Sequence, residues 1–362
     1  MRPVAAGARL TIDLNALVAN YHHLAALCAP ASCAAAVKAD AYGLGLAKVL
    51  QSLLAAGCNT FFVATVQEGI SARQCATEIG FQPVVYVLEG PVEASLAYFA
   101  EFDLHPVLNS QAQVKLWSRT HSERAAAIHV DTGMHRLGML VPEFESLDIN
   151  GLNISLLISH LACGDEHDNP ANAQQLEIMH STFAPFPNIP KSFAHSAGIL
   201  LGSQYHADLC RPGIGLYGGN PFVSGANPMQ AVVQLEGRII QSHWHGAGVT
   251  VGYGASYQCS RRSLLATVAL GYADGLPKSL GNRGRAYFED QPCNIVGQIS
   301  MDLTIVDVTP VAGEIRDGDW LEFMGPHISV DEVAADGERF SYEILTRLGV
   351  RAERNYLPSN KP

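Results

Sequence analysis

Short apolar runs alternate with amphipathic segments from residue 9 to about residue 220, and this alternation dominates the first part of the chain. The runs are apolar at consecutive positions, which is typical of strands buried on both faces. The segments between them repeat apolar residues at helical spacing. Expected strands lie at 9–13, 34–37, 60–64, 84–88, 104–108, 126–130 and 156–160, and expected helices at 14–24, 47–56, 66–78, 94–102, 111–118 and 172–183. This order predicts a parallel α/β fold, and about seven or eight such units fit a (β/α)8, TIM-like barrel.

The pattern changes near residue 231, where the runs become shorter and alternate apolar with polar positions. Expected strands lie at 234–241, 264–270, 285–288, 293–299, 303–308 and 320–323, with one short helix at 342–348. Gly and Pro punctuate them, so we expect a mainly-β domain, sandwich- or barrel-like. The boundary falls in the Gly-, Pro-, Asn- and Ser-rich loop 221–231. The predicted domains are therefore 1–230, a barrel preceded by an N-terminal strand, and 231–362.

Composition narrows the functional classes. The 362 residues suit about two domains. A net charge of −11 without a Lys/Arg cluster disfavours nucleic acid and anionic membranes as partners. No apolar run reaches about 18 residues, and residues 1–9 hold no apolar signal-peptide core. The eight cysteines are scattered, with no Cys-x-x-Cys pair and no zinc spacing, which favours reduced thiols in a cytoplasmic protein and no metal site.

Lys38 is the first candidate for chemistry. It follows the apolar run 34–37 and precedes a turn that ends in Gly43-Leu44-Gly45. The carboxyl ends of parallel strands are where barrels place their active sites. A partly desolvated lysine there becomes a nucleophilic amine that forms Schiff bases with carbonyl compounds, pyridoxal phosphate (PLP) among them. The alternative is a solvated lysine at a strand end.

Further candidates follow later strands. Arg136 lies in a glycine-flanked loop and suits either a phenolate or carboxylate ligand or a surface ion pair. His160 suits either stacking on an aromatic cofactor or an ordinary strand end. Ser196, Gly213 and Ile214 lie in the last two loops, where barrels often bind phosphate.

In the second domain, Tyr253 stands between two glycines. A tyrosine whose pKa is lowered by a nearby cation can act as a general acid or base. The alternative is a packing aromatic beside a turn.

Taken together, these stretches resemble alanine racemase, the fold-type III PLP family with a (β/α)8 barrel and a C-terminal β domain. The shared segments, in chain order, are Val37–Gly43, Val130–Met134, Arg136–Gly138, His160, Ser196–Ala197, Arg211–Ile214, Leu216–Gly218, Val251–Gly254, Gly271–Gly275, Ser300–Asp302 and Tyr342–Glu343. They span the chain from about residue 10 to about residue 355. The resemblance implies an isomerase that interconverts L- and D-alanine, supplying D-alanine for the cell-wall peptidoglycan or degrading alanine.

The resemblance also implies roles for individual residues. Lys38 would hold PLP and act as one base, and Tyr253 from the other subunit of a homodimer would be the opposite base. Arg211 would hydrogen-bond the pyridine nitrogen, and His160 would orient the ring or Arg211. The phosphate ligands would be Tyr42, Ser196, Gly213, Ile214 and Tyr342. Arg136 would contact the cofactor phenolate or the substrate carboxylate, Met301 would line the substrate pocket, and Tyr272 would narrow its entrance.

Five positions depart from the family pattern. His129 replaces a lysine that many members carbamylate, so Arg136 needs an anion or His129 itself as partner. His195 replaces an asparagine, and His135 stands where asparagine or glycine is usual. Gln298 and Lys278 replace arginines near the substrate entrance. These changes remove charge from the entrance and leave the two proposed bases in place.

Three other functions remain open. A racemase of broader or shifted amino-acid specificity fits the altered entrance. A non-catalytic PLP-binding protein would need neither a second domain nor Tyr253. A decarboxylase on a related barrel would use a cysteine acid in the β domain, and Cys259 and Cys293 lie outside that pattern.

Overall fold

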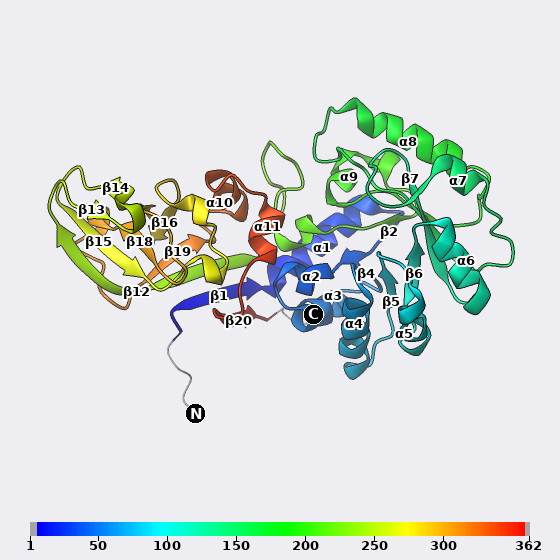
Figure 1. Ribbon diagram of the computed structural model, residues 1–362, viewed down its shortest axis with the longest axis horizontal. Helices are drawn as coiled ribbons and strands as arrows, with labels where there is room; N and C mark the ends of the chain where they lie inside the picture. Colours follow the sequence, from blue (N-terminus) through cyan, green and yellow to red (C-terminus); the bar gives the residue numbers. More distant parts are fainter. Residues whose placement is uncertain (1–5, 359–362) are drawn as a thin grey trace. The chain divides into compact units, whose positions relative to one another are not determined.

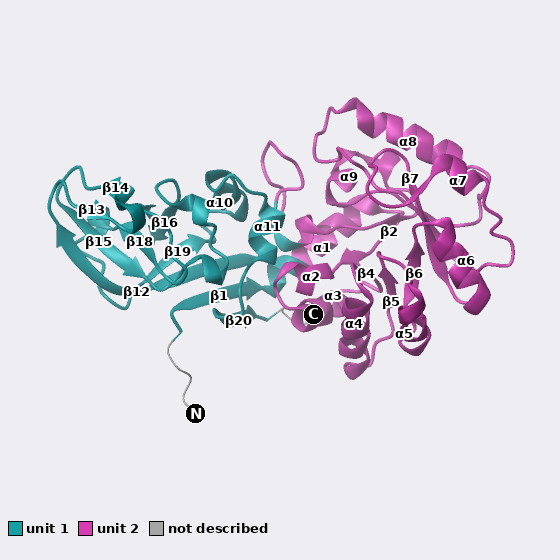
Figure 2. Ribbon diagram, viewed as in Figure 1, with its two compact units in different colours: residues 1–17, 217–219, 230–362 teal, residues 18–216, 220–229 magenta. Residues whose placement is uncertain are grey.

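The computed structural model describes residues 6–358 and contains two compact units (Figures 1 and 2). One unit comprises residues 18–216 and 220–229. The other comprises the described parts of 1–17, 217–219 and 230–362. Residues 1–5, on which the expectation of no signal peptide partly rests, lie outside the described residues. Between residues 6 and 358 no helix is long and apolar enough to cross a membrane.

The first unit is a ring of parallel strands. One path runs β10-β9-β7-β6-β5-β4-β3, and the short β8 (Met139–Leu140) pairs with β7. The ring closes through β11, which pairs with β2, and through the Arg211 N–H, which donates to the Ala194 carbonyl at 2.8 Å. The predicted parallel barrel is therefore confirmed. Its strands are β2 (Ser32–Cys33), β3 (Ala35–Ala36), β4 (Thr60–Val63), β5 (Val84–Val87), β6 (His105–Leu108), β7 (Ala126–Asp131), β9 (Ile154–Ile158), β10 (Lys191–Ser192) and β11 (Leu209–Cys210).

The barrel core is built from one or two side chains of nearly every strand or its flank. Its buried members are Ala34, Phe62, Tyr86, Val107, Ala127, Leu156, Ile158 and Leu209. Phe62 and Tyr86 stack with their ring centroids 4.9 Å apart. Because these positions are filled, the barrel is a packed core, and only the loops at its ends are free for binding.

Helices follow the strands and surround them, as α4, α5, α6 and α8 show in Figure 1. Local caps fix where several begin. Thr65 and Glu68 form a reciprocal capping box at α4, and Ser110 caps α6. The helices are α1 (Leu14–Cys28), α3 (Leu46–Ala55), α4 (Val66–Glu78), α5 (Leu96–Glu101), α6 (Gln111–Thr120), α7 (Val141–Glu145), α8 (Pro170–Phe183) and α9 (Ser196–Leu201).

The second unit is built on one sheet, in the order β15-β18-β17-β16-β19-β12-β1-β20. Strand β12 pairs with both β19 and β15, so the first six strands close into a barrel. Its pairings are antiparallel except that of β1 with β20, which confirms the expected mainly-β domain. The strands are β1 (Ala8–Asp13), β12 (Val233–His245), β15 (Ser263–Val268), β16 (Arg285–Phe288), β17 (Gln291–Ile295), β18 (Thr304–Asp307), β19 (Trp320–Met324) and β20 (Glu353–Leu357).

Several elements of this unit differ from the sequence-based expectation, including the short strands β13 (Thr250–Val251) and β14 (Tyr257–Gln258). Strand β1, grouped there with the barrel, pairs with β12 and β20. Helix α10 (Val330–Asp336) and strand β20 were not predicted, whereas α11 (Ser341–Thr346) matches the one expected helix. A single strand shows its own apolar pattern but not its partner, which explains the misplacement of β1.

Candidate active site

Lys38 opens a turn of unusual conformation. It follows β3, and the next four residues, Ala39–Tyr42, have φ between 53° and 56°. The left-handed region costs an L-residue about 1–2 kcal/mol. Side chains offset this strain: Glu68 Oε1 accepts the Ala39 N–H at 2.7 Å, and Asp40 Oδ1 accepts the Leu46 N–H at 2.7 Å. The turn therefore fixes Lys38 at the carboxyl end of the strand, where strain is typical of a functional site.

The surroundings of Lys38 favour its neutral amine. Burial and the nearby charge of Arg136 lower the pKa of Lys38, and the opposing effect of Glu68 is smaller. A lowered pKa makes a larger fraction of the amine nucleophilic at neutral pH. This supports the first of the two readings of Lys38.

The two glycine-rich loops form a cradle beside it. The buried Ser196 hydroxyl accepts the N–H of Gly213 at 2.8 Å and of Gly215 at 3.2 Å. A Cβ on Gly213 would lie 2.3 Å from the Tyr42 hydroxyl oxygen, so any larger residue would displace the Tyr42 side chain. Ile214 begins the next short helix. The Ser196 and Tyr42 hydroxyls and the Gly213 backbone therefore lie close together, and these are group types that bind phosphate.

Arg211 is buried at the end of β11. Its Nη1 donates to Ser192 Oγ, and its Nη2 donates to the Ser159 carbonyl at 2.7 Å and lies 3.4 Å from His160 Nδ1. Burial lowers the pKa of Arg211 to about 10, so it stays charged at neutral pH. Burial, the neighbouring His195 ring and the charge of Arg211 lower the pKa of His160 well below its ordinary value. A neutral His160 therefore lies beside a charged Arg211.

His195 is a buried residue that caps helix α9 and lies beside His160. Its Nδ1 accepts the Ala197 N–H at 3.1 Å and caps α9, and its ring lies 4.9 Å from that of His160. A Cβ on Gly164 would lie 2.9 Å from its Cε1. Burial and Arg211 lower the pKa of His195 to about 4. This neutral histidine is therefore the cap that starts the Ser196 helix.

Arg136 is exposed in its loop and makes no hydrogen bond or ion pair within residues 6–358. His129 instead bonds Asn109 Oδ1 through Nδ1 at 2.9 Å. Burial and Arg211 lower the pKa of His129 to about 4. His135 lies 3.4 Å from Asp131 Oδ2. The guanidinium of Arg136 thus remains available to a ligand.

The other four predicted site residues lie in the second, mainly-β unit, called the β unit below. All are exposed: Tyr253 by 73 %, Met301 by 53 %, Tyr342 by 45 % and Tyr272 by 43 %. Tyr253 projects from a turn whose flanking glycines have φ of 72° and 69°. A hollow of about 500 Å³ beside it is lined in part by Gln298 and Ser300.

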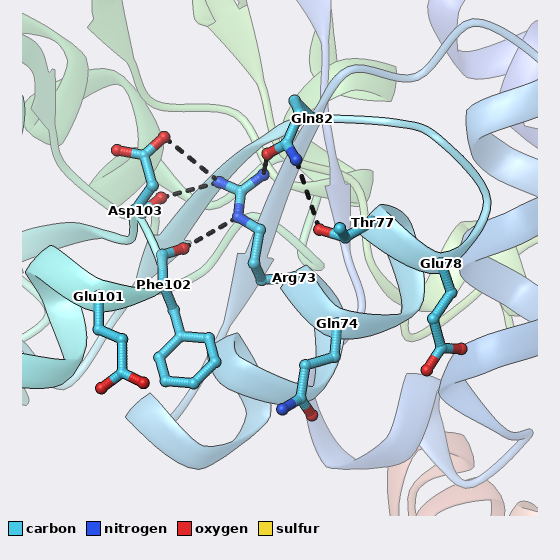
Figure 3. A pocket seen from close by; sticks show the side chains of 8 residues that line it. All are labelled: Arg73, Gln74, Thr77, Glu78, Gln82, Glu101, Phe102 and Asp103. Atoms are coloured by element: carbon cyan, nitrogen blue, oxygen red, sulfur yellow. Dashed lines mark hydrogen bonds and ion pairs between the residues drawn. The ribbon is translucent and has the colours of Figure 1, made fainter.

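A second hollow, of about 630 Å³, lies between α4 and α5 (Figure 3). The Arg73 guanidinium donates hydrogen bonds there to the Phe102 and Asp103 carbonyls and to Gln82 Oε1. Gln82 and Asp103 precede β5 and β6, so this hollow lies at the amino ends of the strands. That end of a barrel usually serves stability, and none of the predicted site residues lines the hollow.

Comparison with known families identifies both parts of the chain. The chain matches the alanine racemase N-terminal domain over residues 12–221 and the alanine racemase C-terminal domain over residues 232–356. The chain belongs to the alanine racemase family. An alanine racemase of Rhodospirillum rubrum is 43 % identical over 97 % of this chain and 96 % of its own. A catabolic alanine racemase of Agrobacterium fabrum is 42 % identical over 97 % of this chain and 92 % of its own.

Among solved structures, an alanine racemase from Bartonella henselae with covalently bound pyridoxal phosphate aligns with a TM-score of 0.92. It is 40 % identical, and the alignment covers 98 % of this chain and all of that one. The barrel and β domain are therefore those of alanine racemases.

Two further residues support this site and are not among the candidates that the sequence predicts. Glu68 holds the Lys38 turn through Ala39 and also accepts the Ala64 N–H at 2.7 Å. Gln175 is buried, donates to the His160 carbonyl at 3.1 Å and accepts the Ala162 N–H at 2.8 Å. The Thr65-x-x-Glu68 capping box was a visible signal, whereas nothing local marks Gln175.

Proposed function

We propose that the chain interconverts L- and D-alanine with pyridoxal phosphate, using Lys38 and Tyr253 of the partner subunit as two bases. The observation that carries the proposal is the lowered pKa of Lys38 at the barrel's carboxyl end, beside an N–H and hydroxyl cradle. The proposal includes a cytoplasmic homodimer with shared active sites and a domain boundary near residue 230.

The residues of the barrel unit fit the cofactor. Lys38 would bind its carbonyl carbon, and Tyr42, Ser196, Gly213 and Ile214 would hold its phosphate. The buried hydroxyl of Ser196 and the absence of a Cβ at Gly213 support this assignment. Tyr342 would complete the phosphate site. Bound to an amino acid, the cofactor supplies an electron sink that acidifies the α-carbon.

Arg211 would reduce the electron-withdrawing capacity of the cofactor ring. An arginine that remains charged at neutral pH donates a hydrogen bond but does not readily transfer its proton. The pyridine nitrogen facing it would then stay unprotonated, which disfavours side reactions such as transamination. His160, neutral and 3.4 Å from Arg211, would orient it.

Racemisation requires proton transfer on both faces of the α-carbon, either by two groups or by one that swings across. Lys38 would serve one face. Tyr253 of the partner subunit would serve the other, and its 73 % exposure in one chain supports a role toward another chain. Arg136 would meet the phenolate or the substrate carboxylate, while Met301 and Tyr272 would bound the alanine pocket.

The test is a panel of L-amino acids assayed for D-enantiomers, together with borohydride reduction and peptide mapping. We expect D-alanine as the main product and the cofactor fixed to Lys38. A protein that takes up no PLP, or that fixes it elsewhere, would refute the proposal.

A racemase of broader specificity is the second candidate. Uncharged Gln298 lines the hollow beside Tyr253, and exposed Lys278 stands at the other altered position. Comparable rates with several larger amino acids in the same panel would favour it.

A further inference from the structure

We infer that Arg351 is a positioning residue for substrate-size selection, because it joins the loop that carries Tyr272 to the loop that carries Met301. The inference rests on the proposed function, which takes these two side chains as walls of the alanine pocket. All the residues concerned lie in the β unit.

The two loops already touch through their backbones. The Tyr272 N–H donates to the Ser300 carbonyl at 3.0 Å, and the Ala273 N–H donates to the Met301 carbonyl at 2.9 Å. A Cβ on Gly271 would lie 2.3 Å from the Met301 carbonyl oxygen. The spacing of the two walls is thus set by a close backbone contact, which a small shift of either loop would break.

Arg351 holds both loops with one guanidinium. Its Nε and Nη2 donate to the two oxygens of Asp274 at 2.8 and 2.9 Å, and its Nη1 donates to Asp302 Oδ1 at 2.6 Å. Asp274 belongs to the Tyr272 loop and its Oδ2 also accepts the Gly271 N–H at 2.9 Å. Asp302 directly follows Met301. A planar fork is needed for this arrangement, and lysine cannot reproduce it.

The pair with Asp274 differs from an ordinary surface ion pair. The Asp274 side chain is only 5 % exposed, whereas that of Arg351 is 47 % exposed. Removing Arg351 would leave a buried carboxylate without its cation, so the Gly271–Gly275 turn would have to rearrange. The Met301 loop would lose its link to that turn at the same time.

This contact bears on selectivity because Tyr272 and Met301 are themselves half exposed. Neighbouring side chains hold them only in part, so their positions depend on the loops beneath. A pocket discriminates against a substrate that is one methylene larger by about 10–200-fold in kcat/KM. A pocket wall that moves easily would no longer provide this discrimination.

The experiment compares kcat and KM for L-alanine and L-serine in wild type, Arg351→Ala, Arg351→Lys and Asp302→Asn. Arg283→Ala is the matched control, because it removes an exposed ion pair with Glu338 in the same unit. We expect Arg351→Ala to lower the alanine-to-serine ratio of kcat/KM by about tenfold, mainly because kcat/KM for serine rises as the larger substrate is no longer rejected. Arg351→Lys and Asp302→Asn should show smaller changes of the same sign, and Arg283→Ala none. The absorbance of bound PLP should not change.

An unchanged ratio in all Arg351 and Asp302 variants, with only a lower melting temperature, would overturn the inference. If Arg351→Ala does not fold, the other two variants decide the matter. A wild-type protein that forms no D-alanine would instead refute the proposed function, so the two failures are distinguishable.

Discussion

Acid should destabilise the protein through His195, and the size of the effect can be worked out. Its pKa is about 4 in the folded protein against an ordinary 6.5. As the pH falls from 6.5 to 4, His195 therefore becomes protonated in the unfolded chain but stays neutral in the folded chain. The contribution to stability is fully present above pH 6.5 and is lost progressively down to pH 4. At pH 5 the loss from this one histidine is about 2 kcal/mol.

The perturbation is His195→Asn, which keeps a side-chain acceptor for the Ala197 N–H but does not titrate. Urea unfolding followed by far-UV circular dichroism at pH 7 and pH 5 measures the fall in the free energy of unfolding. We expect this fall to be about 2 kcal/mol smaller in the variant than in wild type. His23→Asn, on the exposed side of α1, is the control and should fall as wild type does. An equal fall in His195→Asn and wild type would refute the reasoning.

Two further predictions concern the cofactor and the shared site. Gly213→Ala should weaken PLP binding more than Ser196→Ala, because its Cβ meets the Tyr42 hydroxyl at 2.3 Å whereas Ser196→Ala removes only hydrogen bonds; equilibrium dialysis measures both, and the reverse order would contradict the cradle. Mixing inactive Lys38→Ala and Tyr253→Phe subunits should restore part of the activity, since one of the two sites in a hybrid dimer is complete; no restoration would argue against shared sites.

The barrel was predictable because its signal is local. Runs such as 61–64 and 84–88 are apolar at consecutive positions, which is typical of short strands buried on both faces. Lys38, Ser196 and Gly213 could be singled out because the carboxyl ends of such strands converge. The structure shows the expected barrel and places these three residues in one unit.

What the sequence left out depends on long-range partners or on backbone conformation. The left-handed turn at Ala39–Tyr42 contains no glycine, so no residue type in it indicates a positive φ. Strand β20 pairs with β1 although the paired residues are more than 340 positions apart in the sequence, as Arg9 and Glu353 are. Helix α10 does carry a local signal, because Ser329 and Glu332 form a capping box that is visible in the sequence.

The most direct test of the account is α-proton exchange in heavy water, with Tyr253→Phe compared with wild type for each enantiomer of alanine. Wild type should introduce deuterium at the α-carbon from both sides. With Tyr253 replaced, exchange from one enantiomer should slow by about 100-fold, while Lys38 continues to exchange the other. Exchange of both enantiomers at the wild-type rate would contradict the assignment of Lys38 and Tyr253 as opposing bases.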